Sequence, residues 1–172
     1  MHRRHFIGKK RISSALDPQL LLSLRALKGK DLRELRQTII KVASNQWAKR
    51  YEIDELAQPE VKSSVYVIEL KPDVWDCSRC SDNLSDTKPD SPAFYVGSTG
   101  RPVKLRIAQH REGYKSSHMA REHFKRRAVE LEPCDEDGRS WESRLNRSTA
   151  QEIELNLLPS LLKLLGYAAH SR

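Results

Sequence analysis

The sequence contains few aromatic residues, few cysteines and no long hydrophobic run. Aromatic residues make up only 6% of the 172 residues, so we expect a largely aliphatic core. No apolar stretch approaches the ~20 residues that a membrane-spanning helix requires, and the charged amino terminus lacks the apolar segment of a secretory signal. Three cysteines without such a signal indicate a reducing compartment and no disulfide framework. We therefore expect an intracellular, cytoplasmic protein that does not bind membranes.

The formal net charge of +8 is distributed unevenly along the chain. Residues 1–50 contain 13 Lys or Arg and 3 Asp or Glu, and residues 101–127 contain 9 and 2, whereas both remaining segments are net acidic. Two basic blocks on an otherwise acidic chain are typical of a surface for a polyanion, most often nucleic acid. A solvated basic surface without a partner produces the same pattern, so the charge alone leaves both interpretations open.

Composition and turn signals divide the chain into two parts. Residues 1–60 form a basic arm followed by a helical extension, in which Asp17 and Pro18 are suited to the first positions of a helix. In residues 61–172, β-branched and aromatic residues predict strands, whereas apolar residues at helical spacing predict helices. The expected strands are 63–70, 93–97 and 128–132, and the expected helices are 101–112, 116–127 and 140–165.

This order of elements indicates a small α+β domain with a largely antiparallel three-stranded sheet flanked by helices. Residues 71–92 are dense in Pro, Asp and Ser, so we expect an inserted loop between the first two strands. The domain therefore comprises residues 61–172 with this insertion at 71–92.

The helix expected at 101–112 has an unusual packing face. At 3.6 residues per turn, Arg106 and His110 lie on the same face as Val103 and Ile107. A cation and an imidazole on a packing face are costly unless they line a cleft or form structural hydrogen bonds. The periodicity alone leaves these two interpretations open.

The last helix raises a similar question about Glu154. This residue falls within the apolar stripe that Ile153 and Leu157 define, whereas Glu152 points away and could complete a capping box with Thr149. A carboxylate inside an apolar stripe usually has a cationic partner or a metal ion. Glu154 is therefore a candidate functional residue.

Taken together, these residues resemble the GIY-YIG nuclease family, most closely its restriction endonuclease branch. Ser64-Val65-Tyr66 is similar to the first motif of the family, and Tyr95-Val96-Gly97 is similar to the second. The pair formed by Arg106 and His110 resembles the family's helix motif, and Glu154 resembles its later glutamate. The resemblance covers residues 63–166 approximately and implies a metal-dependent DNA endonuclease that hydrolyses phosphodiester bonds.

The sequence departs from the family pattern at three points. Ser64 stands where the motif has its first glycine, a strand position at which a side chain is tolerable. Twenty-nine positions separate Tyr66 from Tyr95, where the family has a tight hairpin. The asparagine that many members carry well after the glutamate is missing, because no Asn follows Asn156.

The resemblance also implies a role for each motif residue. Glu154 would hold one Mg²⁺ or Mn²⁺ ion, and Arg106 would bind the phosphate. Tyr66 would act as the general base, with His110 accepting the tyrosine's proton. Tyr95 would orient phosphate or water. The partner would be DNA, bound by a protein that acts as a homodimer on symmetric sites.

Gly97 and the basic residues near the motifs are candidates for nucleic-acid contacts. Gly97 would let the backbone approach closely, and each basic side chain on a phosphate would steepen the salt dependence of binding. The basic candidates are Arg101, Lys104, Arg111, Lys115, Arg121, Lys125 and Arg126.

Cys77 and Cys80 have the spacing of a zinc knuckle, but no second pair of ligands is evident in the sequence. Cys134 with His118 or His123 could complete a zinc site, but we favour the interpretation that no zinc is bound.

The nuclease interpretation also has two rivals. One is a catalytically inactive nucleic-acid-binding module on the same fold, and the other is a helical DNA-binding regulator that works through residues 17–56.

Overall fold

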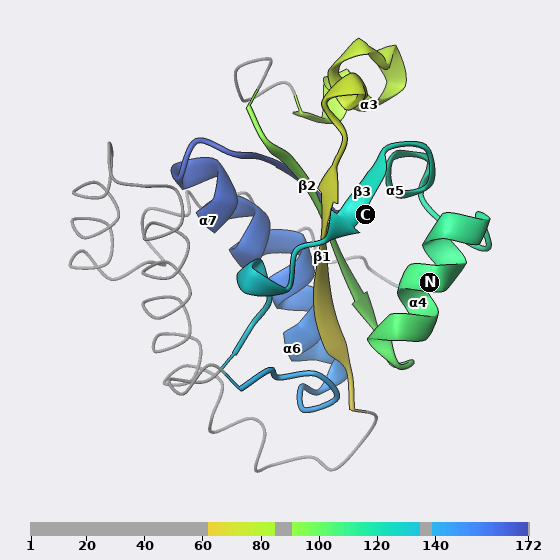
Figure 1. Ribbon diagram of the computed structural model, residues 1–172. Helices are drawn as coiled ribbons and strands as arrows, with labels where there is room; N and C mark the ends of the chain where they lie inside the picture. Colours follow the sequence, from red (N-terminus) through yellow and green to blue (C-terminus); the bar gives the residue numbers. More distant parts are fainter. Residues whose placement is uncertain (1–61, 85–90, 135–138, 172) are drawn as a thin grey trace, which may run out of the picture.

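The computed structural model describes residues 62–84, 91–134 and 139–171 (Figure 1). The helical extension expected at 1–60, including residues 17–56, lies outside this described part. In the three described ranges, no helix has the length and apolar character needed to cross a bilayer.

A four-stranded sheet forms the centre of the domain. Its strands are β1 (Ser64–Leu70), β2 (Ala93–Thr99), β3 (Phe124–Arg127) and β4 (Ala168–His170), in the spatial order β3-β1-β2-β4. β1 pairs antiparallel with both β2 and β3, whereas β4 runs parallel to β2. The expectation of a three-stranded, largely antiparallel sheet is therefore wrong in strand number and in the direction of one edge. β4 contributes only three residues, which is too few for a periodicity to be recognised.

The third strand also lies earlier than expected. It comprises Phe124–Arg127, a range that the sequence predicts to be helical, whereas Val129–Leu131 of the expected strand form the 3₁₀ turn η3. The physical reason is charge pairing across the sheet edge. Glu69 lies opposite Arg126 in the register, and its carboxylate contacts Arg126 Nε at 2.7 Å and Lys125 Nζ at 2.7 Å. Opposite charges on neighbouring strands stabilise this pairing.

Helices cover both faces of the sheet (Figure 1). α4 (Val103–Glu112) and α5 (His118–Glu122) lie on one face, and α6 (Arg147–Glu152), the π-helical turn η4 (Ile153–Leu157) and α7 (Leu158–Leu164) cover the other. The π turn ends at Leu157, shortly before Pro159 in the first turn of α7, and this proline cannot donate a backbone hydrogen bond. The N-cap residue of α6 is Asn146, whose side chain accepts a hydrogen bond from Thr149 N at 2.8 Å, so the expected capping box at Thr149 is wrong.

The insertion between β1 and β2 contains regular structure. Its described part forms the 3₁₀ helix η2 (Pro72–Asp76) and the helix α3 (Ser78–Leu84), so the expectation of a loop across 71–92 is wrong for these residues. Val74, Cys80 and Leu84 are buried in the same hydrophobic cluster as Ile68 of β1. These buried contacts anchor the insertion against the sheet.

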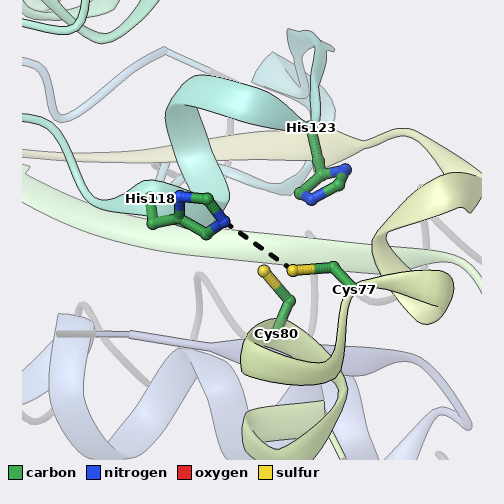
Figure 2. A group of neighbouring side chains, drawn as sticks. All are labelled: Cys77, Cys80, His118 and His123. Atoms are coloured by element: carbon green, nitrogen blue, oxygen red, sulfur yellow. Dashed lines mark hydrogen bonds between the residues drawn. The ribbon is translucent and has the colours of Figure 1, made fainter.

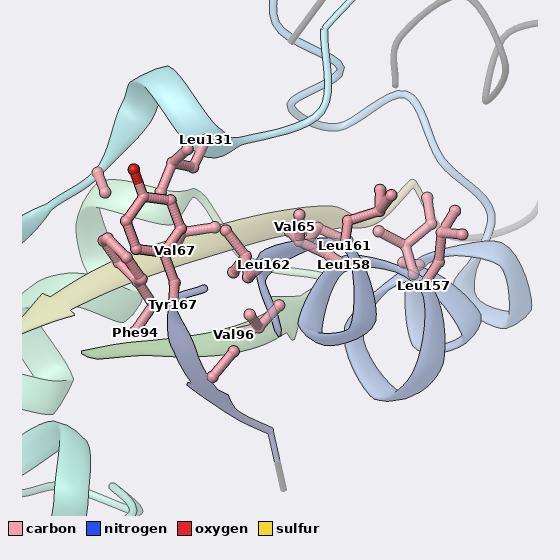
Figure 3. Packing of buried hydrophobic residues seen from close by; sticks show 14 of the residues in the cluster. Val65, Val67, Phe94, Val96, Leu131, Leu157, Leu158, Leu161, Leu162 and Tyr167 are labelled. Carbon is pink, nitrogen blue, oxygen red and sulfur yellow. The ribbon is translucent and has the colours of Figure 1, made fainter. Parts of the chain in front are cut away.

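The alternation of side chains along β1 and β2 produces two hydrophobic clusters. On one face, Val65 and Val67 of β1 and Phe94 and Val96 of β2 pack against leucines of η4 and α7 (Figure 3). On the other face, Tyr66, Ile68 and Tyr95 pack with residues of α4, α5 and the insertion. All seven residues of β1 are buried, as expected for a central strand.

Two leucines of the last helical segment provide a matched test of this packing. Leu161 is 1% exposed in the core, whereas Leu155 is 46% exposed. We expect Leu161→Ala to lower the free energy of unfolding by about 2–5 kcal/mol, because it leaves a cavity. Leu155→Ala should change it by no more than ~0.5 kcal/mol. Urea denaturation followed by circular dichroism measures both, and equal effects would contradict the assigned helix faces.

Candidate active site

A buried hydrogen bond joins β1 to α4. Tyr66 lies on the face of the sheet that α4 covers, and its Oη lies 2.7 Å from Nε2 of His110. Neither residue is more than 1% exposed. The helix face predicted from the sequence is therefore correct for His110, while Leu105 points to solvent. A buried phenol and imidazole satisfy each other's hydrogen-bonding groups in this arrangement.

Ser116 determines which nitrogen of His110 carries the proton. Ser116 Oγ lies 2.7 Å from His110 Nδ1 and 3.1 Å from the carbonyl oxygen of Ser117. When Ser116 donates its single hydroxyl proton to the Ser117 carbonyl, its oxygen can accept a second hydrogen bond. In that arrangement Ser116 accepts from Nδ1–H of His110, which leaves Nε2 as the acceptor for the Tyr66 hydroxyl. The network is thus oriented from Tyr66 through His110 to Ser116.

Gly97 is required for the position of Tyr66. The two residues lie directly opposite each other in the β1–β2 register. A Cβ atom at residue 97 would lie 2.3 Å from Tyr66 Oη and 2.4 Å from Tyr66 Cζ, far inside van der Waals contact. From the sequence, Gly97 is predicted to allow close approach by nucleic acid, whereas in the structure the group that approaches it is the Tyr66 phenol.

Tyr95 and Arg106 complete the surroundings of His110. The ring of Tyr95 meets the His110 ring edge-on, with centroids 5.7 Å apart. Arg106 donates from one guanidinium nitrogen to the carbonyl oxygen of Lys115 at 2.9 Å, which aligns the guanidinium beside the end of α4. Arg106 is partly exposed, whereas Tyr66, Tyr95 and His110 are buried. Arg106 is therefore the member of this group that solvent can reach.

Electrostatic effects on Tyr66 connect four of the predicted residues. Burial raises the pKa of the Tyr66 phenol well above its ordinary value, and Tyr95 and Glu154 raise it further, whereas the Arg106 guanidinium lowers it. Tyr66 is therefore protonated at neutral pH. The nitrogen nearest to the phenolic oxygen is His110 Nε2, at 2.7 Å.

Glu154 belongs to the helical layer on the opposite face of the sheet from α4. It lies in the π turn, is 1% exposed, and accepts a short hydrogen bond from Ser98 Oγ of β2. The negative charge of its carboxylate is the smallest contribution to the raised pKa of Tyr66. The π turn matters here because an extra residue in the helical turn alters which side chains face the sheet. The sequence carried no signal for Ser98 or Ser116 as partners of these residues.

Ser64 has its own role at the position where the family motif has a glycine. Its hydroxyl oxygen accepts a hydrogen bond from the backbone N–H of Ser143 at 2.7 Å. The neighbouring Ser63 forms backbone bonds with Leu145 on the same segment. The serine side chain therefore ties β1 to the segment that leads into α6.

The basic residues predicted to contact nucleic acid fall into three groups by their surroundings. Lys125 and Arg126 are held by Glu69, Arg126 also pairs with Glu130, and Arg121 pairs with Glu122. Arg111 lies over the Phe124 ring and Lys115 over the Tyr114 ring. Arg101 and Lys104 are exposed near the start of α4, and neither forms an ion pair with a residue in the described ranges. Cations that are already neutralised by carboxylates would contribute less to phosphate binding. Among the basic candidates, Arg101 and Lys104 would therefore be the most available to a phosphate.

A second group of side chains lies between the insertion and α5. Figure 2 shows Cys77, Cys80, His118 and His123 pointing toward a common space. The expectation that no second pair of ligands accompanies Cys77 and Cys80 is therefore wrong. Cys134 is not a member of this cluster but pairs with Ser140 in an isolated bridge. Hydrogen bonds from Cys80, His123 and His118 lower the pKa of the Cys77 thiol to about 6.

Comparison with known proteins identifies the family pattern. The model of the GIY-YIG catalytic domain matches residues 62–156, more than half of the chain. The matched range contains Tyr66, Tyr95, Arg106, His110 and Glu154. No curated protein and no solved structure matches the chain significantly.

The close approach of Tyr66 to Gly97 predicts a steric coupling between them. Gly97→Ala should lower the free energy of unfolding by about 1–3 kcal/mol, because the added methyl group overlaps the phenol. In a Tyr66→Ala background the same substitution should cost much less, since the overlapping ring is gone. A double-mutant cycle by urea denaturation measures the difference, and purely additive effects would contradict the contact.

Proposed function

Because the chain belongs to the GIY-YIG catalytic domain family, we propose that it is a metal-dependent DNA endonuclease that hydrolyses phosphodiester bonds. The observation that carries this proposal is the oriented hydrogen-bond network from Tyr66 through His110 to Ser116. A structural tyrosine needs only one hydrogen-bond partner. Here the partner is an imidazole whose free nitrogen is aimed at the phenol, and that arrangement suits proton transfer.

The network supports a specific path for the protons. As a water oxygen bonds to phosphorus and the bond from phosphorus to the 3′ oxygen breaks, the water proton passes to Tyr66 Oη. The phenolic proton passes at the same time to Nε2 of His110. Because the Tyr66 pKa is raised, a free phenolate does not accumulate, and the two transfers must be coupled. Ser116 accepts from Nδ1–H throughout and stabilises the imidazolium that results.

Arg106 is suited to bind the phosphate. Its guanidinium is always charged and presents parallel donors that match phosphate oxygens. The bond to the Lys115 carbonyl holds it beside the buried tyrosines while leaving it partly exposed. It would therefore stabilise the charge that builds up on the phosphoryl oxygens during attack. Tyr95, packed edge-on to His110, would orient the water or the phosphate.

The residues around Glu154 fit a hard divalent cation. The Glu154 carboxylate and the Ser98 hydroxyl lie together, and Mg²⁺ and Mn²⁺ prefer such oxygen ligands, with water and phosphate oxygens in the remaining positions. One ion bound there would supply charge stabilisation to the leaving 3′ oxygen. The absence of sulfur and nitrogen donors in this pair argues against a soft metal at the same place.

The finer parts of the proposal concern the substrate and the assembly. Exposed Arg101 and Lys104 support binding of the DNA backbone at the start of α4. The pairing of Tyr66 with His110 favours the restriction-type branch of the family, in which the tyrosine acts as the base. Membership of that branch would in turn favour a homodimer that cleaves symmetric sites. Light scattering with and without DNA tests the dimer.

Cleavage of supercoiled and mixed-sequence linear DNA with Mg²⁺ or Mn²⁺ tests the activity. We expect discrete fragments from the wild-type protein and a loss of roughly 10²–10³-fold in rate for Glu154→Gln. Glu152→Gln is the matched control, because Glu152 is exposed in the same helical segment two residues earlier.

Three other outcomes would contradict the proposal. Equal cleavage by the wild-type protein and Glu154→Gln would mean that the metal ligand is misassigned. DNA binding by both without cleavage would support the inactive binding module. Binding retained after removal of residues 63–172 would favour the helical regulator.

Ser116 provides a separate test of the proton path. We expect Ser116→Ala to lower kcat by about tenfold or less, the value of one lost hydrogen bond, with little change in KM because Ser116 is a positioning residue that does not contact DNA. Ser116→Thr, which keeps the hydroxyl, should restore most of the rate. Ser160→Ala is the control, because that serine also donates to a backbone carbonyl but lies in α7. A change confined to KM would contradict the assigned role.

A further inference from the structure

The cluster between the insertion and α5 has the donor atoms of a metal site. Cys77 and Cys80 each offer a sulfur atom and His118 and His123 each offer a ring nitrogen, and all four atoms lie within 4.8 Å of one another. The two cysteines come from the η2–α3 segment, and the two histidines bracket α5 (Figure 2). Cys77 and His118, which are 41 positions apart in the chain, are thus brought together by the fold. We propose that Cys77, Cys80, His118 and His123 bind one structural Zn²⁺ ion.

The spacing of the donor atoms is close to that of a tetrahedral zinc site. Zinc–sulfur bonds of ~2.3 Å and zinc–nitrogen bonds of ~2.0–2.1 Å give a sulfur–nitrogen separation of about 3.6 Å in a tetrahedron. The Sγ atom of Cys77 lies 3.7 Å from Nε2 of His118. The remaining pairs, all within 4.8 Å, need to contract by no more than about 1.5 Å to reach tetrahedral geometry. Side-chain rotation alone can supply a movement of that size.

Asp73 provides the outer contact that zinc-binding histidines usually have. Its Oδ1 lies 2.9 Å from Nδ1 of His123. A carboxylate that accepts from Nδ1–H leaves Nε2 of the ring as the metal ligand and makes it more basic. His123 is almost fully buried and Asp73 is mostly exposed, so the carboxylate supports the ring from its outer side.

The ligand set indicates a structural ion instead of a catalytic one. Four protein ligands fill a tetrahedral zinc shell and leave no position for water or substrate. Two sulfur and two nitrogen donors also separate this site chemically from the oxygen ligands around Glu154. The zinc site therefore does not depend on the proposed nuclease activity.

The position of the site gives the ion a mechanical role. α5 has five residues, too few for a helix to be stable without tertiary support. His118 is its first residue and His123 follows its last, so one ion would hold both ends of the helix and join it to the insertion. Ser117 caps the same helix, and Ser116, which contacts His110, comes directly before it. The ion would thus hold the segment that orients His110.

Metal content of the full-length protein tests the proposal. The protein is purified in reducing buffer with any histidine tag removed, and zinc is measured by mass spectrometry after dialysis. We expect about one zinc per chain, and Co²⁺ substitution should produce the visible bands of a tetrahedral site together with thiolate charge-transfer absorption. Cys77→Ser combined with Cys80→Ser should abolish both signals.

Two control variants test whether these four residues, and no others, hold the ion. Cys134→Ser removes the remaining cysteine and should keep the zinc, and Glu154→Gln should keep it as well, whatever happens to DNA cleavage. Loss of zinc in Cys134→Ser, an octahedral Co²⁺ spectrum, or a wild-type protein that binds no zinc when it is supplied would overturn the proposal. Because these readouts do not use cleavage, the zinc site and the nuclease activity can fail independently.

Asp73 supplies a test that does not remove a ligand. Asp73 is mostly exposed, so Asp73→Ala should fold normally, which circular dichroism checks. We expect its zinc affinity, measured by competition with a chromophoric chelator, to fall by roughly 10–100-fold. Asp76→Ala, at another exposed aspartate of η2, should keep the wild-type affinity. Equal affinities of all three proteins would overturn the assignment of His123 as an Asp73-supported ligand.

Discussion

The buried hydrogen bond between Tyr66 and His110 is the constraint on which the site depends. It is 2.7 Å long and joins the central strand to α4, where Val103 packs in the same cluster as Tyr66. It requires a glycine at 97, because any side chain there would occupy the space of the phenol. It also requires Ser116, which selects the tautomer of His110. Changes at these positions should therefore affect stability and chemistry together.

The basic block at 101–127 has two physical roles that composition cannot separate. In β3, Lys125 and Arg126 pair with Glu69, Arg126 also pairs with Glu130, and Arg127 pairs with Glu132. The pairs with Glu69 join this polar edge strand to β1. Arg101 and Lys104, at the start of α4, have no such partners among the described residues. The positive charges of β3 therefore serve strand pairing. Those of Arg101 and Lys104 remain at the surface near the proposed active site, where they can attract phosphate.

The proposed metal sites divide the domain by ligand chemistry. Oxygen donors at Glu154 and Ser98 lie toward the α6–α7 layer, whereas sulfur and nitrogen donors lie between the insertion and α5. A hard ion such as Mg²⁺ would bind the oxygen donors, and a softer ion such as Zn²⁺ would bind the sulfur and nitrogen donors. With zinc bound, the insertion, which lengthens the usual hairpin of the family, would stabilise the short helix α5 that follows α4.

Local elements whose patterns are complete within a few residues could be read from the amino-acid sequence. The strands β1 and β2, the packing face of α4 and the buried position of Glu154 could all be predicted, because side-chain periodicity depends only on neighbours in the chain. Tertiary structure alone decided the edge strands β3 and β4, the contact of Ser116 with His110 and the meeting of Cys77 and Cys80 with His118 and His123. These features depend on pairings between distant segments, and a short stretch such as Ala168–His170 acquires its structure from the strand beside it.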